Sequence, residues 1–433
     1  MKIKNYTAKL FLFKKGILIL PLSLLVGNSI FAQKLIQVSN PVALQRNDEL
    51  VVLSRGLIQK KLGAIPAGKF ITVENAKGRE AVQFDDLNND GKWDEAVFLH
   101  SFKPKEKTSF KISITGTQPT TVNTRAHARH RRKDAGDIFG ADLQKDSIPA
   151  GQSATDFSKQ PLPPFLTEGP AWENDKVGFR LYFDVRNGKD IWGKTTPKMV
   201  LDTVGVNPKN NYHVQAQWGM DVLKVGSSLG AGSLALFIPQ PGKKDTLVRL
   251  GGVNMGKVFY ERVADGPARS IIRLHYPSWQ ALKGYKPISV IEEISIWGGQ
   301  YFYESRVYVK NQPAGSKLVT GIVNLKSKKQ NVISSGHDRI LFTYDAQSEN
   351  HDNLGMGIIV QPKYNPAFGQ TPNTGTDIQN TYTAKLDIQD TRQSVFRFYA
   401  AWEKSAADFT TEAGFRAYLS KQSALFNTPL IIK

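Results

Sequence analysis

The sequence contains no cysteine. Disulfide bonds, zinc sites with thiolate ligands, a catalytic cysteine and a lipid-modified N-terminal cysteine are therefore all excluded. Histidine is also scarce, with seven residues, and no His-Glu-x-x-His pattern is present. The glycine-rich stretch from Gly226 to Gly232 lacks the strand-to-helix context and the Lys-Ser/Thr pair of a phosphate-binding loop. The sequence therefore does not support a zinc protease or a nucleotide-binding protein.

Long apolar runs are missing except near the N-terminus. Five lysines and no acidic residue occupy the first 32 positions, the apolar run Ile17 to Val26 follows them, and small residues lie near Ala32. A basic segment, a short apolar segment and a small residue at the cut site are typical of a secretory signal peptide. The run is too short to span a bilayer, which needs about 20 residues. We expect cleavage near Ala32 and a periplasmic or secreted protein without a membrane anchor.

Acidic residues are fewer than basic ones, 38 against 57. The formal net charge of +19 falls to +14 without residues 1–32, because that segment carries five lysines and no acid. A positive field of this size favours anionic partners. Nucleic acid is not expected, because the protein is exported and no RNP, zinc-finger or helix-turn-helix pattern is present. Acidic glycans remain the favoured partners, and the sequence leaves the oligomeric state open.

Helical periodicity is also rare, and most of the chain has the alternation of β-strands. The only convincing helix covers residues 411–423, with Phe415 and Leu419 on one face. Long antiparallel strands with few helices predict an all-β protein built as a large sandwich of two facing sheets. We divide the chain into a signal peptide (1–32), an N-terminal β region (33–118), a basic, proline-rich excursion (119–168) and the main β-sandwich (169–433).

One loop in the N-terminal region has the spacing of a calcium site. Oxygen-bearing side chains occupy its first, third, fifth and ninth positions, and a glycine occupies the sixth. Calcium prefers six to eight oxygen ligands, which this spacing wraps around one point. Val97 replaces the glutamate that closes an EF-hand, so the loop is similar to those between β-strands; an Asx-rich turn without metal is the alternative. The predicted structural Ca²⁺ has as ligands Asp86, Asn88, Asp90, the carbonyl of Lys92, and Asp94.

Four strand-like segments collect arginine, tyrosine and acidic side chains on one face. Such faces are either ordinary solvated sheet surfaces or the walls of a carbohydrate site, where arginine binds carboxylates and aromatic rings stack on sugars. Their recurrence favours a concave sheet that binds carbohydrate. The four faces carry Arg180, Tyr182, Asp184 and Arg186; Arg269, Arg273 and His275; Glu304, Arg306 and Tyr308; and Arg397, Tyr399 and Glu403, with Trp402 alternating.

Three histidines adjoin strands and glycine- or aromatic-rich turns, and these are the candidates for chemistry. They are His213, His275 and His337. A lone histidine is more often structural than catalytic, so each is a weak candidate by itself. His213 is followed by Trp218 and Lys224 within the same block.

Three blocks resemble the secreted family called domain of unknown function 4861. They are the calcium loop with Glu95, the Trp-Glu-Asn-Asp block at 172–175 before the Phe-Arg-Leu-Tyr strand, and the Gly-Met-Asp block starting at Gly219. The resemblance implies a galactose-mutarotase-like β-supersandwich and a link to polysaccharide breakdown. It also implies, for some relatives, dehydration of oligosaccharides that end in a uronic acid, which gives a 4,5-unsaturated residue.

The residues allow that chemistry to be written as an expectation. Elimination across C4–C5 of a uronate needs a cation at the carboxylate, a base for the C5 proton and an acid for the leaving group. A glycoside hydrolase or epimerase on the same fold, and a non-catalytic glycan-binding protein, are the alternatives. The candidate base is His213 and the candidate acids are Tyr182 and His275; the candidate substrate-binding residues are Arg180, Arg186, Arg273, Trp218, Lys224, His337 and Trp402.

Overall fold

The computed structural model describes residues 33–119, 123–388 and 392–433. The predicted signal peptide lies outside the described residues. The expectation of an all-β protein with few helices is confirmed, because the described part consists mostly of antiparallel strands and contains two α-helices. None of the helices in this part combines the length and the apolar character needed to cross a bilayer.

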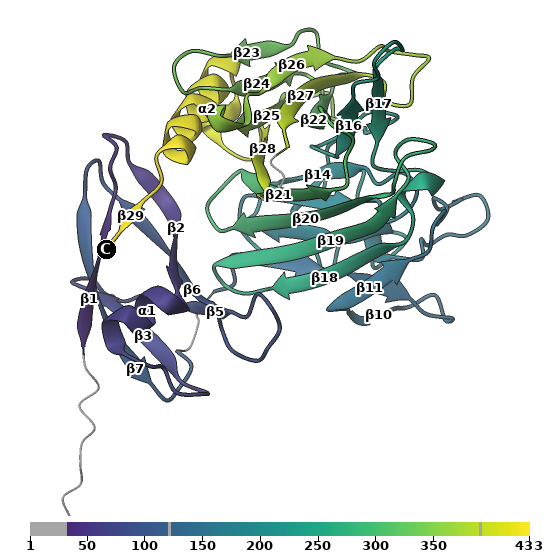
Figure 1. Cartoon of the computed structure of the whole chain (residues 1–433). Helices are drawn as coiled ribbons and strands as arrows, with labels where there is room; N and C mark the ends of the chain where they lie inside the picture. The colour runs from purple at the N-terminus through teal and green to yellow at the C-terminus, as the bar shows by residue number, and fades with distance from the viewer. Residues whose placement is uncertain (1–32, 120–122, 389–391) are drawn as a thin grey trace, which may run out of the picture.

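The first part of the chain forms a small sandwich with its own core, which we call the N-terminal sandwich (Figure 1). Ile36, Val51, Phe98 and Phe110 are fully buried between its two sheets. The last strand of the chain, β29, pairs with β1, so the C-terminus returns to this sandwich. One sheet has the order β29 (Ile431–Ile432), β1 (Lys34–Ser39), β7 (Lys107–Thr115), β3 (Phe70–Asn75), β4 (Gly78–Arg79); the other is β2 (Arg46–Ser54), β6 (Glu95–Phe102), β5 (Gln83–Asp85), followed after β2 by helix α1 (Arg55–Leu62).

The main body is a larger sandwich in which a nine-stranded sheet packs on two five-stranded sheets. Phe179 and Tyr303, from opposite sheets, meet edge to face with ring centroids 4.9 Å apart in the shared core. The nine-stranded sheet has the order β11 (Lys145–Ile148), β18 (Val258–Ala264), β19 (Arg269–Trp279), β20 (Ile288–Trp297), β21 (Phe302–Lys310), β28 (Ser394–Trp402), β25 (Leu354–Val360), β24 (Ile340–Asp345), β23 (Asn331–Ile333). The five-stranded sheets are β15 (Gly219–Asp221), β14 (Lys189–Lys194), β13 (Val177–Leu181), β12 (Ala171–Asn174), β8 (Ala126–Arg129), and β17 (Thr246–Arg249), β16 (Ala235–Ile238), β22 (Lys317–Val323), β27 (Thr381–Asp387), β26 (Ala367–Gln370).

The segment expected to be a basic excursion contributes strands to this body. β8 and β11 join two of the main sheets, and β9 (Arg131–Lys133) pairs with β10 (Phe139–Asp142) in a hairpin. Ion pairs organise the segment, because Asp146 accepts from both His130 and Arg132. Short 3₁₀ turns lie at η1 (Leu166–Glu168), η2 (Val253–Met255), η3 (Pro362–Tyr364) and η4 (Ala407–Phe409).

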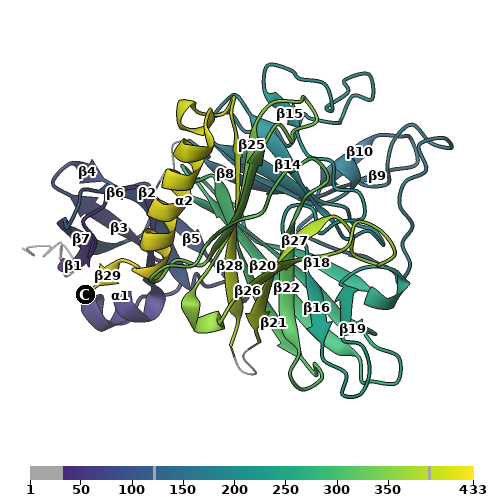
Figure 2. The same ribbon diagram turned by 90° about the horizontal axis from the view of Figure 1, so that it is seen from above.

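The C-terminal helix α2 spans Glu412–Asn427 and lies against the outer face of the nine-stranded sheet, next to the N-terminal sandwich (Figure 2). Thr411 caps its first turn by accepting from the N–H of Gly414 at 3.1 Å. The helix approaches β25 closely because β25 presents glycine there: a Cβ on Gly355 would lie 2.6 Å from the ring of Phe415. It extends four residues beyond the predicted end at Ser423.

Candidate active site

The alternating segment 179–186 does not continue as a strand to its end. β13 stops at Leu181, and a turn reverses the chain into β14. The carboxylate of Asp184 accepts the N–H of Arg186 at 2.8 Å, and Asn187 has a positive φ of 43°. This Asx turn favours chain reversal over strand extension. Arg180 therefore lies within the sheet, whereas Arg186 is held by the turn.

Arg180 is the centre of a buried charge cluster on the outer face of the sheet of β13, β14 and β15. It lies opposite Asp190 in the register, and its side chain is 1% exposed. Its Nη2 donates to Asp190 Oδ2 at 2.9 Å and to Asp221 Oδ2 at 2.6 Å. Its Nη1 donates to the hydroxyl of Tyr212 at 3.1 Å. A buried arginine with this many acceptors holds all of them in a fixed geometry.

Tyr182 and Arg186 extend this cluster toward solvent. The hydroxyl of Tyr182 donates to Asp190 at 2.7 Å and accepts from Arg180 at 3.1 Å. The guanidinium of Arg186 lies 4.0 Å from the centroid of the Tyr182 ring, and its side chain is 36% exposed. Glu168 joins the two arginines, because its carboxylate lies 3.4 Å from Arg180 and 2.6 Å from Arg186.

The backbone that delivers Glu168 is strained. Thr167 and Glu168 both have positive φ, of 50° and 67°. Two consecutive non-glycine residues in this region are costly, and such strain persists only where the surrounding structure enforces it. Here the ion pairs of Glu168 with both arginines enforce it.

His213 reaches the cluster from a long segment, residues 195–218, which covers the outer face of this sheet. Its Nδ1 lies 3.5 Å from Asp221 Oδ2, and the side chain is 54% exposed. The N–H of Asp221 donates to the carbonyl of Tyr212 at 2.9 Å, which fastens the covering segment to β15. His213 and Tyr212 border a cavity of 380 Å³ whose other wall includes Pro161 and Pro163 from the proline-rich segment.

Burial and charge set the proton affinities of these groups. Burial, aided by the nearby carboxylate of Asp190, raises the pKa of Asp221 well above its ordinary value despite Arg180. Burial likewise raises the pKa of the Tyr182 hydroxyl well above its ordinary value. Burial first and Arg180 second lower the pKa of His213. At neutral pH the cluster therefore offers a neutral imidazole and a protonated phenol.

The structure brings together four of the predicted site residues: His213, Tyr182, Arg180 and Arg186. Contacts link each of them to the next through Asp190, Asp221 or the Tyr182 ring. Lys224 is exposed and lies three residues after the end of β15; the next residue, Val225, lies close to Gly188 beside the Tyr182 ring.

Other predicted residues lie elsewhere. His275 and Arg273 are on β19 in the nine-stranded sheet, where Arg273 pairs with Glu261 and Glu293. His337 lies in the turn before β24, and its carbonyl accepts from Asn427 of α2. In sequence Arg273 and His275 have the same alternating pattern as Arg180, but that pattern does not say which sheet a strand joins.

The two predicted tryptophans have packing roles. Trp402 is 2% exposed and packs against β14, so its ring offers no surface to a ligand. Trp218 packs on Trp192, with ring centroids 5.7 Å apart, beneath the covering segment.

Sequence reasoning missed Glu168, Asp190 and Asp221 as members of the cluster. Asp221 stands in the Gly-Met-Asp block, which was a usable signal. The signal for Asp190 was the hairpin register, because the residue opposite Arg180 depends on the length of the turn at 183–188.

The stretch Gly226 to Gly230 has the spacing Gly-x-Ser-x-Gly, but its serine is not a nucleophile. Ser228 is fully buried, and its hydroxyl donates to the carbonyl of Val225 at 2.6 Å. It also accepts the N–H of Gly230 at 2.8 Å. An activated serine needs an adjacent base and an open face, and Ser228 has neither among the described residues.

The predicted calcium loop is folded tightly around its own backbone. Asp86 accepts the N–H groups of Asp90 and Gly91 at 3.2 and 2.7 Å, and Asn88 also accepts from Asp90. Within the described ranges, no group of three or more His, Asp or Glu side chains is arranged to hold a metal ion. The donor set is nevertheless all oxygen, as calcium requires, and calcium binding stays a prediction.

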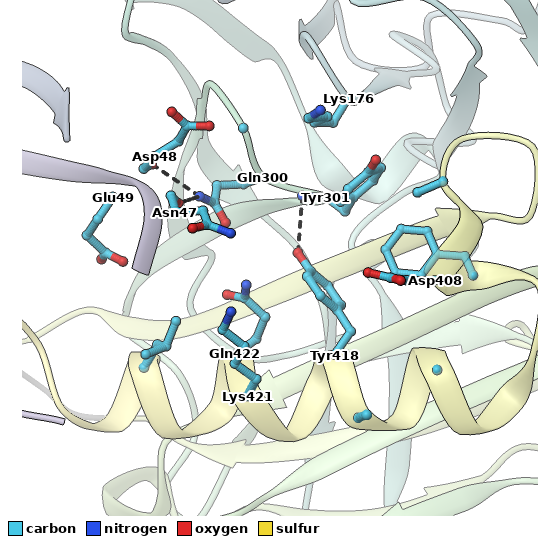
Figure 3. A pocket seen from close by; sticks show the side chains of 16 residues that line it. Asn47, Asp48, Glu49, Lys176, Gln300, Tyr301, Asp408, Tyr418, Lys421 and Gln422 are labelled. Atoms are coloured by element: carbon cyan, nitrogen blue, oxygen red, sulfur yellow. Dashed lines mark hydrogen bonds between the residues drawn. The ribbon is translucent and has the colours of Figure 1, made fainter. Parts of the chain in front are cut away.

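A second cavity, of 570 Å³, lies between β2, the turn at Gln300 and Tyr301, and α2 (Figure 3). Two of its three carboxylates, Asp48 and Glu49, are paired with Arg125 and Arg46, and the third is Asp408. No histidine lines it. These features favour the His213 cluster over this cavity as the place of chemistry.

Comparisons with known proteins give one family. The model of the family described as "Domain of unknown function (DUF4861)" matches residues 38–432. The "Uncharacterized protein P7" of Formosa agariphila is 25% identical over 414 residues, which cover 92% of both chains. Two solved structures from Enterococcus faecalis, an alpha-mannosidase and a protein in glycosyl hydrolase family 38, are each 10% identical with a TM-score of 0.49. They match 93% and 92% of this chain, which spans about half of their length, 46% and 47%.

Proposed function

The chain belongs to the DUF4861 family, as its resemblance suggested, and we propose that this member is a carbohydrate-active enzyme for acidic oligosaccharides. The reaction is β-elimination at a uronic acid at the non-reducing end. The C5–H and C4–O bonds break, a C4=C5 double bond forms, and the C4 substituent leaves with a proton. The observation that carries this proposal is the unbroken chain of contacts from Arg186 through Tyr182, Asp190 and Arg180 to Asp221 and His213.

His213 is assigned as the base that removes the C5 proton. Its lowered pKa keeps the imidazole neutral at neutral pH, so a lone pair is available. Asp221, 3.5 Å from Nδ1, orients the ring, and the charges of Asp190 and Glu168 favour the imidazolium that forms. Nε2 has no hydrogen-bond partner among the described residues and is free to meet the substrate.

Tyr182 is assigned as the acid for the leaving oxygen. Its raised pKa keeps the hydroxyl protonated until the C4–O bond breaks. Arg180, 3.1 Å from that oxygen, stabilises the phenolate left behind. Asp221 is hydrogen-bonded with Asp190, which accepts from Tyr182, so a proton can return from His213 to Tyr182 through the two carboxyl groups.

The substrate carboxylate needs a cation, which makes the C5 proton acidic. Asp184 and Glu168 already balance the charge of Arg186. Lys224 is exposed and has no ionic partner among the described residues. We therefore assign Lys224 as the main partner of the carboxylate, with the exposed edge of Arg186 as the second.

A glycoside hydrolase is less well supported. It needs two accessible carboxyl groups on either side of the scissile bond. Asp190 and Asp221 are fully buried on one arginine. The carboxylates considered from the sequence are bound in separate ion pairs: Glu173 with Lys194, Asp184 with Arg186, Glu293 with Arg273, and Glu304 with Arg306.

The test supplies residues 33–433 with oligosaccharides that end in different uronic acids and follows the ultraviolet absorbance of an unsaturated uronate. Mass spectrometry of the products separates loss of water from chain cleavage. His213→Ala should lower the rate about 100-fold or more, because a positioned general base contributes at least that factor. Tyr182→Phe should lower kcat similarly while leaving substrate binding intact.

His275→Ala is the matched control, because His275 is a strand-adjacent histidine outside the cluster, and it should react at the wild-type rate. Absence of absorbance across a broad panel of uronides would refute the proposed reaction. Wild-type turnover by His213→Ala would refute the assigned base. Glycan binding without turnover would instead identify a binding protein.

A further inference from the structure

A groove lies on the outer face of the nine-stranded sheet, on a different sheet from the His213 cluster. Its larger part is a cavity of 680 Å³ between β21, β28, η3 and the end of α2. A smaller cavity of 330 Å³ continues it toward the calcium loop and shares the side chains of Glu304, Arg306 and Arg397 with it. We call the two together the outer groove.

The larger part of the outer groove has more positive than negative charge, whereas three cations and four carboxylates line the smaller part. Four cations line its larger part, against two carboxylates. Glu304 is buried and is bound by Arg306 at 2.7 Å and Arg397 at 3.0 Å. Glu49 is paired with Arg46 outside the lining. The four cations are Arg306, Lys363, Arg392 and Arg397.

Two of these cations have no ionic partner among the described residues. Lys363 is exposed, and its ammonium lies 5.0 Å from the centroid of the Tyr364 ring. Arg392 is exposed at the start of the segment that leads into β28. Arg306 is 43% exposed and presents the outer edge of a guanidinium whose other edge Glu304 fixes. A ligand carboxylate would meet charges that need no protein partner to be displaced.

The groove also has a rigid base and an apolar edge. Arg397 is sandwiched by aromatic rings, 4.5 Å from the centroid of Phe302 and 4.2 Å from that of Phe426. Tyr308 is 39% exposed on the same face of β21 as Arg306. The guanidinium of Arg306 and the ring of Tyr308 together suit a sugar with an acidic substituent. The guanidinium can bind the oxyanion, and the aromatic ring can cover the apolar face of the sugar.

We propose that the outer groove is a second binding site, for the acidic groups of an anionic saccharide. Lys363, Arg392 and Arg306 bind its carboxylate or sulfate groups, and Tyr308 contacts a sugar ring. The anion preference rests on the charges of the groove alone, whereas the saccharide class rests on the proposed function. The groove would hold a distant part of a polyanionic chain and raise its local concentration near the enzyme.

The experiment is calorimetric titration of residues 33–433 with hexagalacturonate, a sulfated hexasaccharide and neutral cellohexaose. The double variant Lys363→Gln/Arg392→Gln should bind the anionic hexasaccharides about tenfold more weakly or worse, and binding should weaken with added salt. Lys77→Gln/Lys257→Gln is the matched control: it loses two exposed lysines, and Lys257 also lies over an aromatic ring, that of Phe259. The control should stay within about twofold of wild type.

The carboxylated and sulfated probes identify which oxyanion the groove prefers, and preference for either supports the proposal. Equal affinity of the groove variant and wild type for both anionic probes would overturn it, as would equally strong binding of cellohexaose. Failure of the proposed reaction is seen separately, because it appears as absent turnover while titration still reports groove binding. The groove can also fail alone. This outcome is seen if Lys363→Gln/Arg392→Gln turns over a uronate disaccharide at the wild-type rate and also binds the longer anion with wild-type affinity.

Discussion

The His213 cluster and the outer groove contain the same residue types in opposite arrangements. In the cluster, Arg180 is 1% exposed and shared among buried carboxylates. In the groove, Arg306 is 43% exposed, and Lys363 has no ionic partner among the described residues. Buried, paired charges are held rigidly and have shifted proton affinities, whereas exposed, unpaired charges attract ions and are screened by salt. The first arrangement suits proton transfer and the second suits binding.

The comparison is tested most strongly by removing one arginine from each region. Arg180→Met leaves Asp190 and Asp221 buried without their cation, and breaking a buried pair in this way costs about 3–5 kcal/mol. Arg306→Met leaves Glu304 bound to Arg397, so we expect a loss of about 0–1 kcal/mol. Urea unfolding of both variants measures the difference. Equal losses would contradict the contrast between the two regions.

Much of the cluster could be predicted from sequence, but only part of the groove, namely the polar strand faces that carry Arg306, Tyr308 and Arg397. Alternation in β13 predicts that Arg180 lies on a polar face, and the glycine- and aromatic-rich turn around His213 marks it as a candidate. The partners Asp190 and Glu168 depend on hairpin register and on a strained turn, neither of which periodicity encodes. The groove cations Lys363 and Arg392 lie in a 3₁₀ turn and in the segment that leads into β28, outside any regular pattern, and only the packing of η3 and α2 against β28 assembles them.

Calcium bound at the predicted loop should stabilise the part of the molecule next to the outer groove. The carbonyl of Leu87 in the predicted calcium loop lies 3.4 Å from Arg273 Nη2, and Leu87 lines the smaller cavity of the groove. We expect Ca²⁺ at 100 times its dissociation constant to stabilise the protein by about 2.7 kcal/mol. The measurement is the midpoint of thermal unfolding with Ca²⁺ and with a chelator.

Asp86→Ala/Asp90→Ala should abolish that stabilisation, while Asp134→Ala/Asp137→Ala, in another acidic turn, should retain it. An identical midpoint with and without Ca²⁺ in the unaltered chain would contradict the metal site.

On the side of the His213 cluster, the ion pairs of His127, which we call the histidine lock, should stabilise the folded state. His127 on β8 contacts Asp265 at 2.9 Å and Asp202 of the covering segment at 3.4 Å. Burial lowers the pKa of His127, but its bonds to Asp202 and Asp265 outweigh this and raise it to about 9. Because the folded-state pKa exceeds the unfolded value of about 6.5, the stabilisation is complete below pH 6.5 and is lost as pH rises through 9.

Since Asp202 is largely exposed, we expect this lock to contribute only about 1 kcal/mol. Urea unfolding at several pH values measures it. His127→Gln should remove the stability decline between pH 6.5 and 9, and a decline that persists unchanged would assign it to another group.

The smallest expected effect is a shift in the pH dependence of kcat/KM. It tests whether His213 is the residue that removes the proton. The base must be deprotonated, so kcat/KM should fall as pH falls through the pKa of His213. Burial and Arg180 lower that pKa, so the acid limb should lie below the 6.5 of an ordinary histidine. Because burial and Asp190 raise the pKa of Asp221, Asp221→Asn removes no charge beside Nδ1; it should leave the acid limb in place and reduce kcat by breaking the proton path to Tyr182. An acid limb at or above 6.5 in the wild type would show that the buried cluster does not tune His213, and the contrast with the outer groove would then be one of packing alone.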